Sequence, residues 1–448
     1  MRGLTIGLVS GAMAIAACGD NGNTKPPDAM PMIDAPPPLL SPEEVAALHQ
    51  LSPLPAVPAD PTNSHADDPK AAALGQMLFF DKSYSGALAV ADDGTNGGLG
   101  MIGEAGKVAC ASCHAAGSEG LDDRRSRPNN VSLGTDYGTR NALAAINSSF
   151  ATWTNWGGRF DSQWSLPLAV AENAKIMNTT RLQIAHVLYA KYRTEYNATF
   201  AVPLDAALDP TAADAARFPA VGKPGQTVFD NMAQADKDLV NTIFANYGKA
   251  LEAYVRTLVS RDAPFDRFVA GDTAAIGSGA VRGLKLFLSK GCVHCHSGPT
   301  FSDDGFHALV VPQTGPHVPA TDNGRYQDVP ALLASPFNTA GAFSDNTTTG
   351  KLANLVQATS QMGQFRTRML RNVAMTAPFM HSGQLATLAD VIAFYDAGGG
   401  DPGSTGIVKD PLLVPLGLSA QDQADLVEFL QTLTGEPPPA AVLVDTSK

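Results

Sequence analysis

Four of the five cysteines fall into two copies of one short motif. The copies are Cys110-Ala-Ser-Cys113-His114 and Cys292-Val-His-Cys295-His296. In c-type cytochromes, two thioether bonds attach a haem to such a cysteine pair, and the adjacent histidine coordinates the iron. A zinc site or a redox-active cysteine pair is the alternative, but neither explains a histidine at the same offset in both copies. The motifs therefore predict two covalently bound haem c groups.

The N-terminal segment is typical of an exported bacterial protein. Met1-Arg2-Gly3 precedes an uncharged run from Leu4 to Ala17, which is too short to span a bilayer comfortably. The following Cys18 completes a pattern that resembles the bacterial lipobox, in which the cysteine is lipidated. Ordinary cleavage nearby, with Cys18 lost or free, is the alternative. We predict a lipoprotein signal peptide over residues 1–17 and a lipid-anchored periplasmic protein, the compartment where bacteria attach haem c.

The overall charge narrows the class of partner. The 448-residue chain carries a formal net charge of −12 and no basic cluster, which argues against nucleic-acid binding. An acidic surface could steer a cationic electron-transfer partner towards the protein, although solubility explains the same charge.

Apolar residues recur mostly with the period of a helix, and strand patterns are sparse. The spacing predicts helices over about 236–258 and 281–290, and two more that begin at Thr387 and Ser419. Ser41 with Glu44 forms a capping box at the start of the ordered chain. We therefore expect a mostly α protein of two cytochrome c-like haem domains, with long loops and little sheet.

One haem motif lies in each half of the chain, which suggests one domain for each haem. We predict a disordered tether over 18–40, an N-terminal haem domain over 41–222, a C-terminal haem domain over 223–436 and a tail over 437–448. Residues 87–106 and 311–364 carry little periodicity and are expected to form surface loops.

The residues around both motifs resemble the bacterial di-haem cytochrome c peroxidase family, including its MauG-like branch. The resemblance covers about residues 70–400. It is carried by Arg140-Asn141-Ala142, Trp156-Gly-Gly-Arg159, Phe365 to Val373, Thr376 to Gly383 and Phe394 to Gly399. The C-terminal segments, in this order, are highly specific.

The resemblance implies a ligand set for each iron. His114 and His296 are the proximal ligands, and Tyr395 lies fourteen residues after His381, at the family's position for the sixth ligand of the C-terminal haem. Most peroxidases of the family have methionine there, whereas the MauG-like branch has tyrosine. Tyr395 could also be a core aromatic residue, and Met380 is the nearby alternative ligand.

The N-terminal haem is the expected site of peroxide binding. In the methionine-ligated members, a histidine from the following loop closes the distal face until activation. Here that loop contains Asn129 and Asn130 and no histidine. The resemblance therefore implies an N-terminal haem whose sixth position is open, as in the MauG-like branch.

The sequence departs from the family where acid–base chemistry is expected. The family places glutamine and glutamate ten and twenty residues after the tryptophan, but those positions are Leu166 and Ile176 here. Cleavage of peroxide needs a group that moves a proton between its oxygens. Glu172, one helical turn before Ile176, is the candidate replacement, and a solvated helix residue is the alternative; Asn173 and Lys175 are further candidates.

Two more roles follow from the resemblance alone. Trp156 matches a tryptophan that lies between the haems and can relay electrons, although it could simply be a large buried aromatic residue. Asn141, Thr376 and Pro378 match the ligands of an inter-domain calcium ion, and oxygen ligands suit that hard cation.

We therefore expect an oxidoreductase that reduces hydrogen peroxide at the N-terminal haem. Electrons would come from a small cytochrome c or another periplasmic donor, through the C-terminal haem and Trp156. A MauG-like enzyme, which uses a high-valent di-haem state to oxidise Trp or Tyr of a partner protein, is the first alternative. A non-catalytic di-haem electron carrier is the second.

Overall fold

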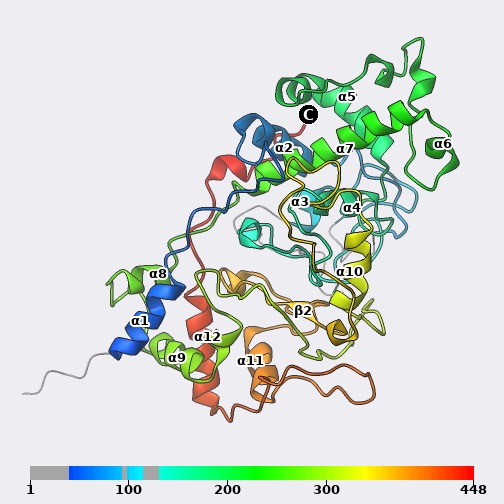
Figure 1. The fold of residues 1–448 in the computed structure, drawn as a ribbon. Coiled ribbons are helices and arrows are strands. Elements are labelled where there is room, and N and C mark those ends of the chain that lie inside the picture. Colours follow the sequence, from blue (N-terminus) through cyan, green and yellow to red (C-terminus); the bar gives the residue numbers. More distant parts are fainter. Residues whose placement is uncertain (1–39, 93–97, 115–130) are drawn as a thin grey trace, which may run out of the picture. The chain divides into compact units, whose positions relative to one another are not determined.

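The computed structural model describes residues 40–92, 98–114 and 131–448. This part of the chain is mostly helical, and its one small sheet pairs β1 (Phe306–His307) antiparallel with β2 (Phe365–Arg366). The α-helices are α1 (Pro42–Leu51), α2 (Pro69–Phe80), α3 (Cys110–Cys113), α4 (Leu166–Glu172), α5 (Arg181–Thr199), α6 (Thr227–Asp230), α7 (Gln234–Val255), α8 (Pro264–Val269), α9 (Ser278–Ser289), α10 (Arg325–Leu333), α11 (Leu388–Asp396) and α12 (Ala420–Gln431) (Figure 1). The predicted fold class is confirmed.

The sequence located the main helices well. The helices expected over 236–258 and 281–290 are α7 and α9, which begin two and three residues earlier. Thr387 and Ser419 cap α11 and α12 through complete capping boxes, and Ser41 does the same for α1. Such caps satisfy backbone N–H groups that the first helical turn leaves without partners.

The first hydrophobic core positions the first haem motif. It is built mainly from α2, α4, α5 and α7, with Leu74, Leu78, Trp164 and Tyr247 among its fully buried residues. Helices α2 and α7 cross closely at Gly75, where a Cβ atom would lie only 1.9 Å from the carbonyl oxygen of Ala250. Because α3 packs against α2, this crossing sets the place of the cysteine motif.

The second core positions the second motif in the same way. It joins α1, α8, α9, α11 and α12 around a cluster of phenylalanines (Figure 1). A Cβ atom at Gly283 would lie 1.9 Å from the carbonyl oxygen of Asp425, so α9 and α12 also need a glycine to approach. Helix α9 ends at Ser289, directly before the Cys292–His296 motif.

Neither core follows the expected domain boundary in the chain. Helix α7 lies after residue 222 yet packs in the first core, whereas α1, near the start of the chain, packs in the second. The boundary between 41–222 and 223–436 stays a prediction. The tail over 437–448 packs against the first core, where Tyr254 donates to the Val442 carbonyl and Gln76 to those of Ala441 and Val444.

The loop over 311–364 does more than cover the surface. It contains α10, and its Asp322 and Asp328 form ion pairs with Arg140 of the N-terminal half. The predicted signal peptide, Cys18 and most of the predicted tether lie outside the described residues. Among the residues described, no helix has both the length and the apolar character to cross a membrane.

A buried ion pair fastens α1 to the second core and yields a prediction. Asp266 on α8 accepts hydrogen bonds from Arg371 at 2.7 and 3.0 Å and from Ser52, just after α1, at 2.5 Å. Burial alone would raise the pKa of Asp266, but Arg371, Ser52 and the Ala263 N–H together lower it. This carboxylate therefore stabilises the fold above its unfolded pKa of about 3.9, and the contribution is lost as the pH falls through the folded pKa.

We expect Asp266→Asn to lower the free energy of unfolding by about 3–5 kcal/mol at neutral pH, because Arg371 would remain buried without its counter-charge. The variant should also lose less stability than the native protein as the pH falls, because it has no Asp266 carboxylate to protonate. Denaturant unfolding of the haem-loaded protein measures both effects. Asp262→Asn, which removes an exposed partner of Arg267, is the matched control and should change stability by less than about 0.5 kcal/mol.

Candidate haem-binding sites

The first motif opens onto a cavity of about 340 Å³. Cys110, Cys113 and His114 line it, together with apolar residues of α4 and α7. The Nδ1 atom of His114 lies 2.7 Å from the carbonyl oxygen of Leu143, so that N–H donates there and Nε2 is the ligand atom. Burial lowers the pKa of His114, which keeps the ring neutral as an iron ligand requires.

The second motif opens onto a cavity of about 280 Å³ with the same construction. Cys292, Cys295 and His296 line it, and Nδ1 of His296 lies 2.9 Å from the Phe301 carbonyl oxygen. Burial again lowers the pKa of the imidazole. Each cavity thus offers two thiols, an oriented neutral imidazole and a largely apolar wall, which fits a haem c group.

Tyr395 lies on the wall of the C-terminal cavity, as its predicted role requires. Burial, with smaller contributions from Cys292 and Cys295, raises its pKa well above the usual value. A phenol in this place stays protonated unless a metal ion stabilises the phenolate. Met380 also lines this cavity. Both residues are therefore placed where they could reach a haem iron. Ligation by Tyr395, with Met380 as the alternative, stays a prediction.

Trp156 lies where the two cavities meet. It lines the C-terminal cavity, and its indole N–H donates to the carbonyl oxygen of Asn141 at 2.7 Å. Asn141 itself lines both cavities. The guanidinium of Arg368, another residue common to both, lies 5.7 Å from the centre of the Trp156 ring. The position suits a relay between the haems, which stays a prediction.

The structure does not bring Glu172 to the N-terminal cavity, which corrects the expected acid–base role. Its carboxylate accepts from Nε and Nη2 of Arg181 at 2.9 and 2.8 Å, and from the Arg181 backbone N–H. The physical reason is local: Arg181 begins α5, where the free N–H groups and the helix dipole attract a carboxylate. Leu166, Ile176, Asn173 and Lys175 do line the cavity.

Two of the three predicted calcium ligands are neighbours. The side-chain amide of Asn141 donates to the Pro378 carbonyl at 2.7 Å, whereas the Thr376 hydroxyl donates to the Val373 carbonyl. Asn129 and Asn130, expected over the distal face of the first haem, lie outside the described residues.

His381 is a fixed packing element beside the second cavity. Its ring stacks on Phe365 with centroids 3.8 Å apart, and its Nε2 accepts from the amide of Gln313 at 2.7 Å. Burial, with a smaller contribution from Arg140, lowers its pKa to about 4, so the ring is neutral. This agrees with its interpretation as a residue that supports the site rather than binding the iron.

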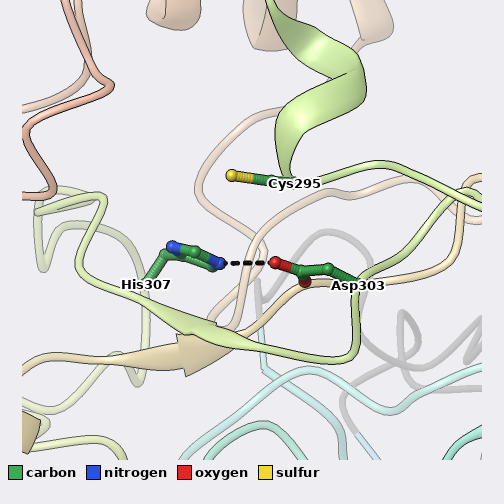
Figure 2. Close-up of side chains that lie close together, drawn as sticks. All are labelled: Cys295, Asp303 and His307. Atoms are coloured by element: carbon green, nitrogen blue, oxygen red, sulfur yellow. Dashed lines mark hydrogen bonds and ion pairs between the residues drawn. The ribbon is translucent and has the colours of Figure 1, made fainter.

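His307, for which no role was predicted, lies beside the second motif. Its Nδ1 lies 2.7 Å from Asp410 and its Nε2 lies 3.0 Å from Asp303, and the Cys295 sulfur lies close to the same ring (Figure 2). Cys295, Asp410 and Asp303 raise the pKa of His307 to about 10. A thioether would remove the contribution of the sulfur, but both carboxylates would still hold the imidazolium. Since Cys295 is needed for haem attachment, we do not assign a separate metal site here.

Comparison with known proteins identifies the family. The family model for di-haem cytochrome c peroxidase matches residues 69–274. The chain is 32% identical over 396 residues to cytochrome-c peroxidase IdrP1 of Denitromonas iodatirespirans, which covers 86% of each chain. The chain belongs to the di-haem cytochrome c peroxidase family. It is therefore a peroxidase-like oxidoreductase with two haem groups.

Other relatives extend the comparison to the MauG-like branch. The methylamine utilization protein MauG of Methylorubrum extorquens is 29% identical over 373 residues, which cover 82% of this chain and 79% of that protein. A crystal structure of a MauG-like protein associated with microbial copper homeostasis matches with a TM-score of 0.56 at 24% identity, over 89% of this chain and 97% of that one. At this identity the structural match supports the fold alone.

The ligand assignment yields a prediction. We expect Tyr395→Met to leave both haems attached and to raise the reduction potential of the C-terminal haem, because a thioether favours the ferrous state. The shift should fall within the roughly 0.8 V that axial ligands span. Spectroelectrochemistry and electron paramagnetic resonance of the purified protein measure it. Met380→Leu is the control: a change of ligand spectrum in this variant, and none at Tyr395, would assign the bond to Met380.

Proposed function

We propose that this protein reduces hydrogen peroxide at the N-terminal haem site, with electrons from a small cytochrome c or another periplasmic one-electron carrier. The observation that carries this proposal is the pair of adjoining cavities, each with a complete haem-attachment motif and both lined by Asn141. Membership of the peroxidase family supports the reaction, and the N-terminal signal expected from the sequence supports the compartment.

When bound, the haem groups would supply the redox chemistry: iron at the first site for peroxide and iron at the second for electron entry. The protein orients the two histidine ligands and limits the water in the first cavity. Leu143 and Phe301 fix the tautomers of His114 and His296 through their carbonyls. Leu166 and Ile176 keep part of the first cavity apolar, which limits water around the bound oxidant.

A MauG-like oxidation of Trp or Tyr in a partner protein is the second candidate, and Tyr395 on the cavity wall favours it. Arg368 holds a positive charge over the ring of Trp156, which disfavours oxidation of that indole in a relay of either reaction. We rank peroxide reduction by an external donor first because cytochrome-c peroxidase IdrP1, at 32% identity, is more similar to this chain than MauG, at 29%.

The test is peroxide consumption by the full-length di-haem protein. With reduced cytochrome c present, we expect donor oxidation and peroxide loss far faster than with a free haem peptide. A long-lived oxidised spectrum after peroxide is added to the fully ferric protein, without a donor, would instead support the MauG-like reaction. If the protein shows neither activity, the remaining candidate function is that of a di-haem electron carrier.

We also propose that one Ca²⁺ joins the two halves of the protein at Asn141, Thr376 and Pro378. Support comes from the contact of the Asn141 amide with the Pro378 carbonyl. Binding would require the amide to turn so that its oxygen, together with backbone carbonyls, faces the ion.

We expect about one equivalent of calcium in protein purified with Ca²⁺, and none in Asn141→Ala. Chelation should lower the melting temperature, and Ca²⁺ should restore it better than Mg²⁺, which demands stricter octahedral geometry. Elemental analysis that finds no calcium in the native protein would contradict the proposal.

A further inference from the structure

The N-terminal cavity needs a source of protons that the expected residue does not provide. Reduction of one peroxide consumes two electrons and two protons and yields two waters. Glu172 is turned away in its ion pair with Arg181, and Leu166 and Ile176 cannot ionise. Among the described residues, a proton donor must therefore be sought elsewhere on the cavity wall, which carries Lys175 and two carboxyl groups.

Among the described residues that line this cavity, the carboxyl groups belong to Asp328 and Glu252. Asp328 accepts from Nη1 of Arg140 at 2.7 Å, so it serves as the anion of an ion pair. Glu252, on α7, is only 2% exposed, and no cation of the described residues is in hydrogen-bond contact with it. Its carboxyl instead accepts a hydrogen bond from the side-chain amide of Asn63 at 3.0 Å, and the turn that carries Asn63 begins at Asp60, the neighbouring carboxyl that helps to raise the pKa of Glu252.

The charges around Glu252 favour its protonated form. Burial, followed by the neighbouring Asp60, raises its pKa well above the usual value. On α7 itself, Arg256 acts only at longer range and is bound to Asp67, while Lys249 is bound to Asp345. Burial and the neighbouring carboxyl therefore keep the proton on Glu252.

Asp60 connects this pair with the outside. It lies in the segment between α1 and α2, is partly exposed, and accepts from the backbone N–H and hydroxyl of Thr62 at 2.8 and 2.6 Å. Those bonds hold its Oδ1 and fix the carboxyl in place beside Glu252. The wall of the cavity and the solvent are thus joined by two carboxyl groups in sequence.

We propose that Glu252 and Asp60 form the proton entry of the N-terminal site. Glu252 releases its proton into the cavity as peroxide is reduced, and solvent restores it through Asp60, twice for each peroxide. The electrons come from the one-electron donor already proposed. This inference rests on the proposed peroxide reduction, but the existence of the protonated pair can be tested without turnover.

The first test is a rapid-mixing experiment on full-length Glu252→Gln with both haems attached. We expect its reaction with peroxide to be about 10²-fold slower, the lower end of what a positioned proton donor contributes. In the native protein the rate should fall at high pH as Glu252 loses its proton, and this dependence should vanish in the variant. Asp262→Asn, which changes an exposed carboxyl outside the cavity, should keep the native rate and pH profile.

Asp60→Asn separates the two roles. Glu252 can still give one proton in this variant, so the step that uses the first proton should stay close to the native rate. Completion of the first turnover, which needs a second proton, and all later turnovers should slow. Native rates and an unchanged pH profile in both Glu252→Gln and Asp60→Asn would overturn the proposal.

Infrared spectroscopy provides a readout that does not depend on activity. The ferric native protein at neutral pH should show the carbonyl stretch of a buried protonated carboxylic acid, and Glu252→Gln should lack it. Absence of this band from the native protein would overturn the proposal even if peroxide is consumed. If the band is present but peroxide is not consumed, the proton pair stands and the proposed reaction fails.

Discussion

The relative position of the two haem cavities depends on the hydrogen bonds of one residue, Asn141. Asn141 donates its backbone N–H to the His381 carbonyl at 2.8 Å and its side-chain amide to Pro378 at 2.7 Å, and its carbonyl accepts from Trp156. The bond to Pro378 is buried and the bond from Trp156 is partly buried, so exchanging either for water has a cost. They hold the segment that lines both cavities, and thus set how the two haem sites face each other.

Arg140, the preceding residue, fixes the same segment by charge. It forms a bidentate pair with Asp322 and a further bond to Asp328, all three being almost fully buried. Burying such charges has a large desolvation cost, so the cluster adds little net stability over apolar packing. Its effect is on geometry, since it ties the loop that carries α10 to the wall of the N-terminal cavity.

Local patterns predicted much of this arrangement, because motif spacing and capping boxes act over a few residues. The cysteine motifs, α7, α9 and the caps of α11 and α12 follow from such patterns. The pairing of Glu252 with Asp60, and of His307 with Asp410, could not be predicted in this way, because tertiary packing joins residues far apart in the chain. The position of Glu172 could not be predicted for a similar reason. It lies one helical turn before Ile176 in the sequence, but in the structure its carboxylate accepts a hydrogen bond from the backbone N–H of Arg181, at the start of α5.

The same geometry would separate the paths of electrons and protons. Electrons would pass from the second cavity by way of Trp156, at the junction that Asn141 holds, and protons would enter from α7 through Glu252. A site built in this way accepts electrons and protons from different walls, while Leu166 and Ile176 keep part of the cavity apolar.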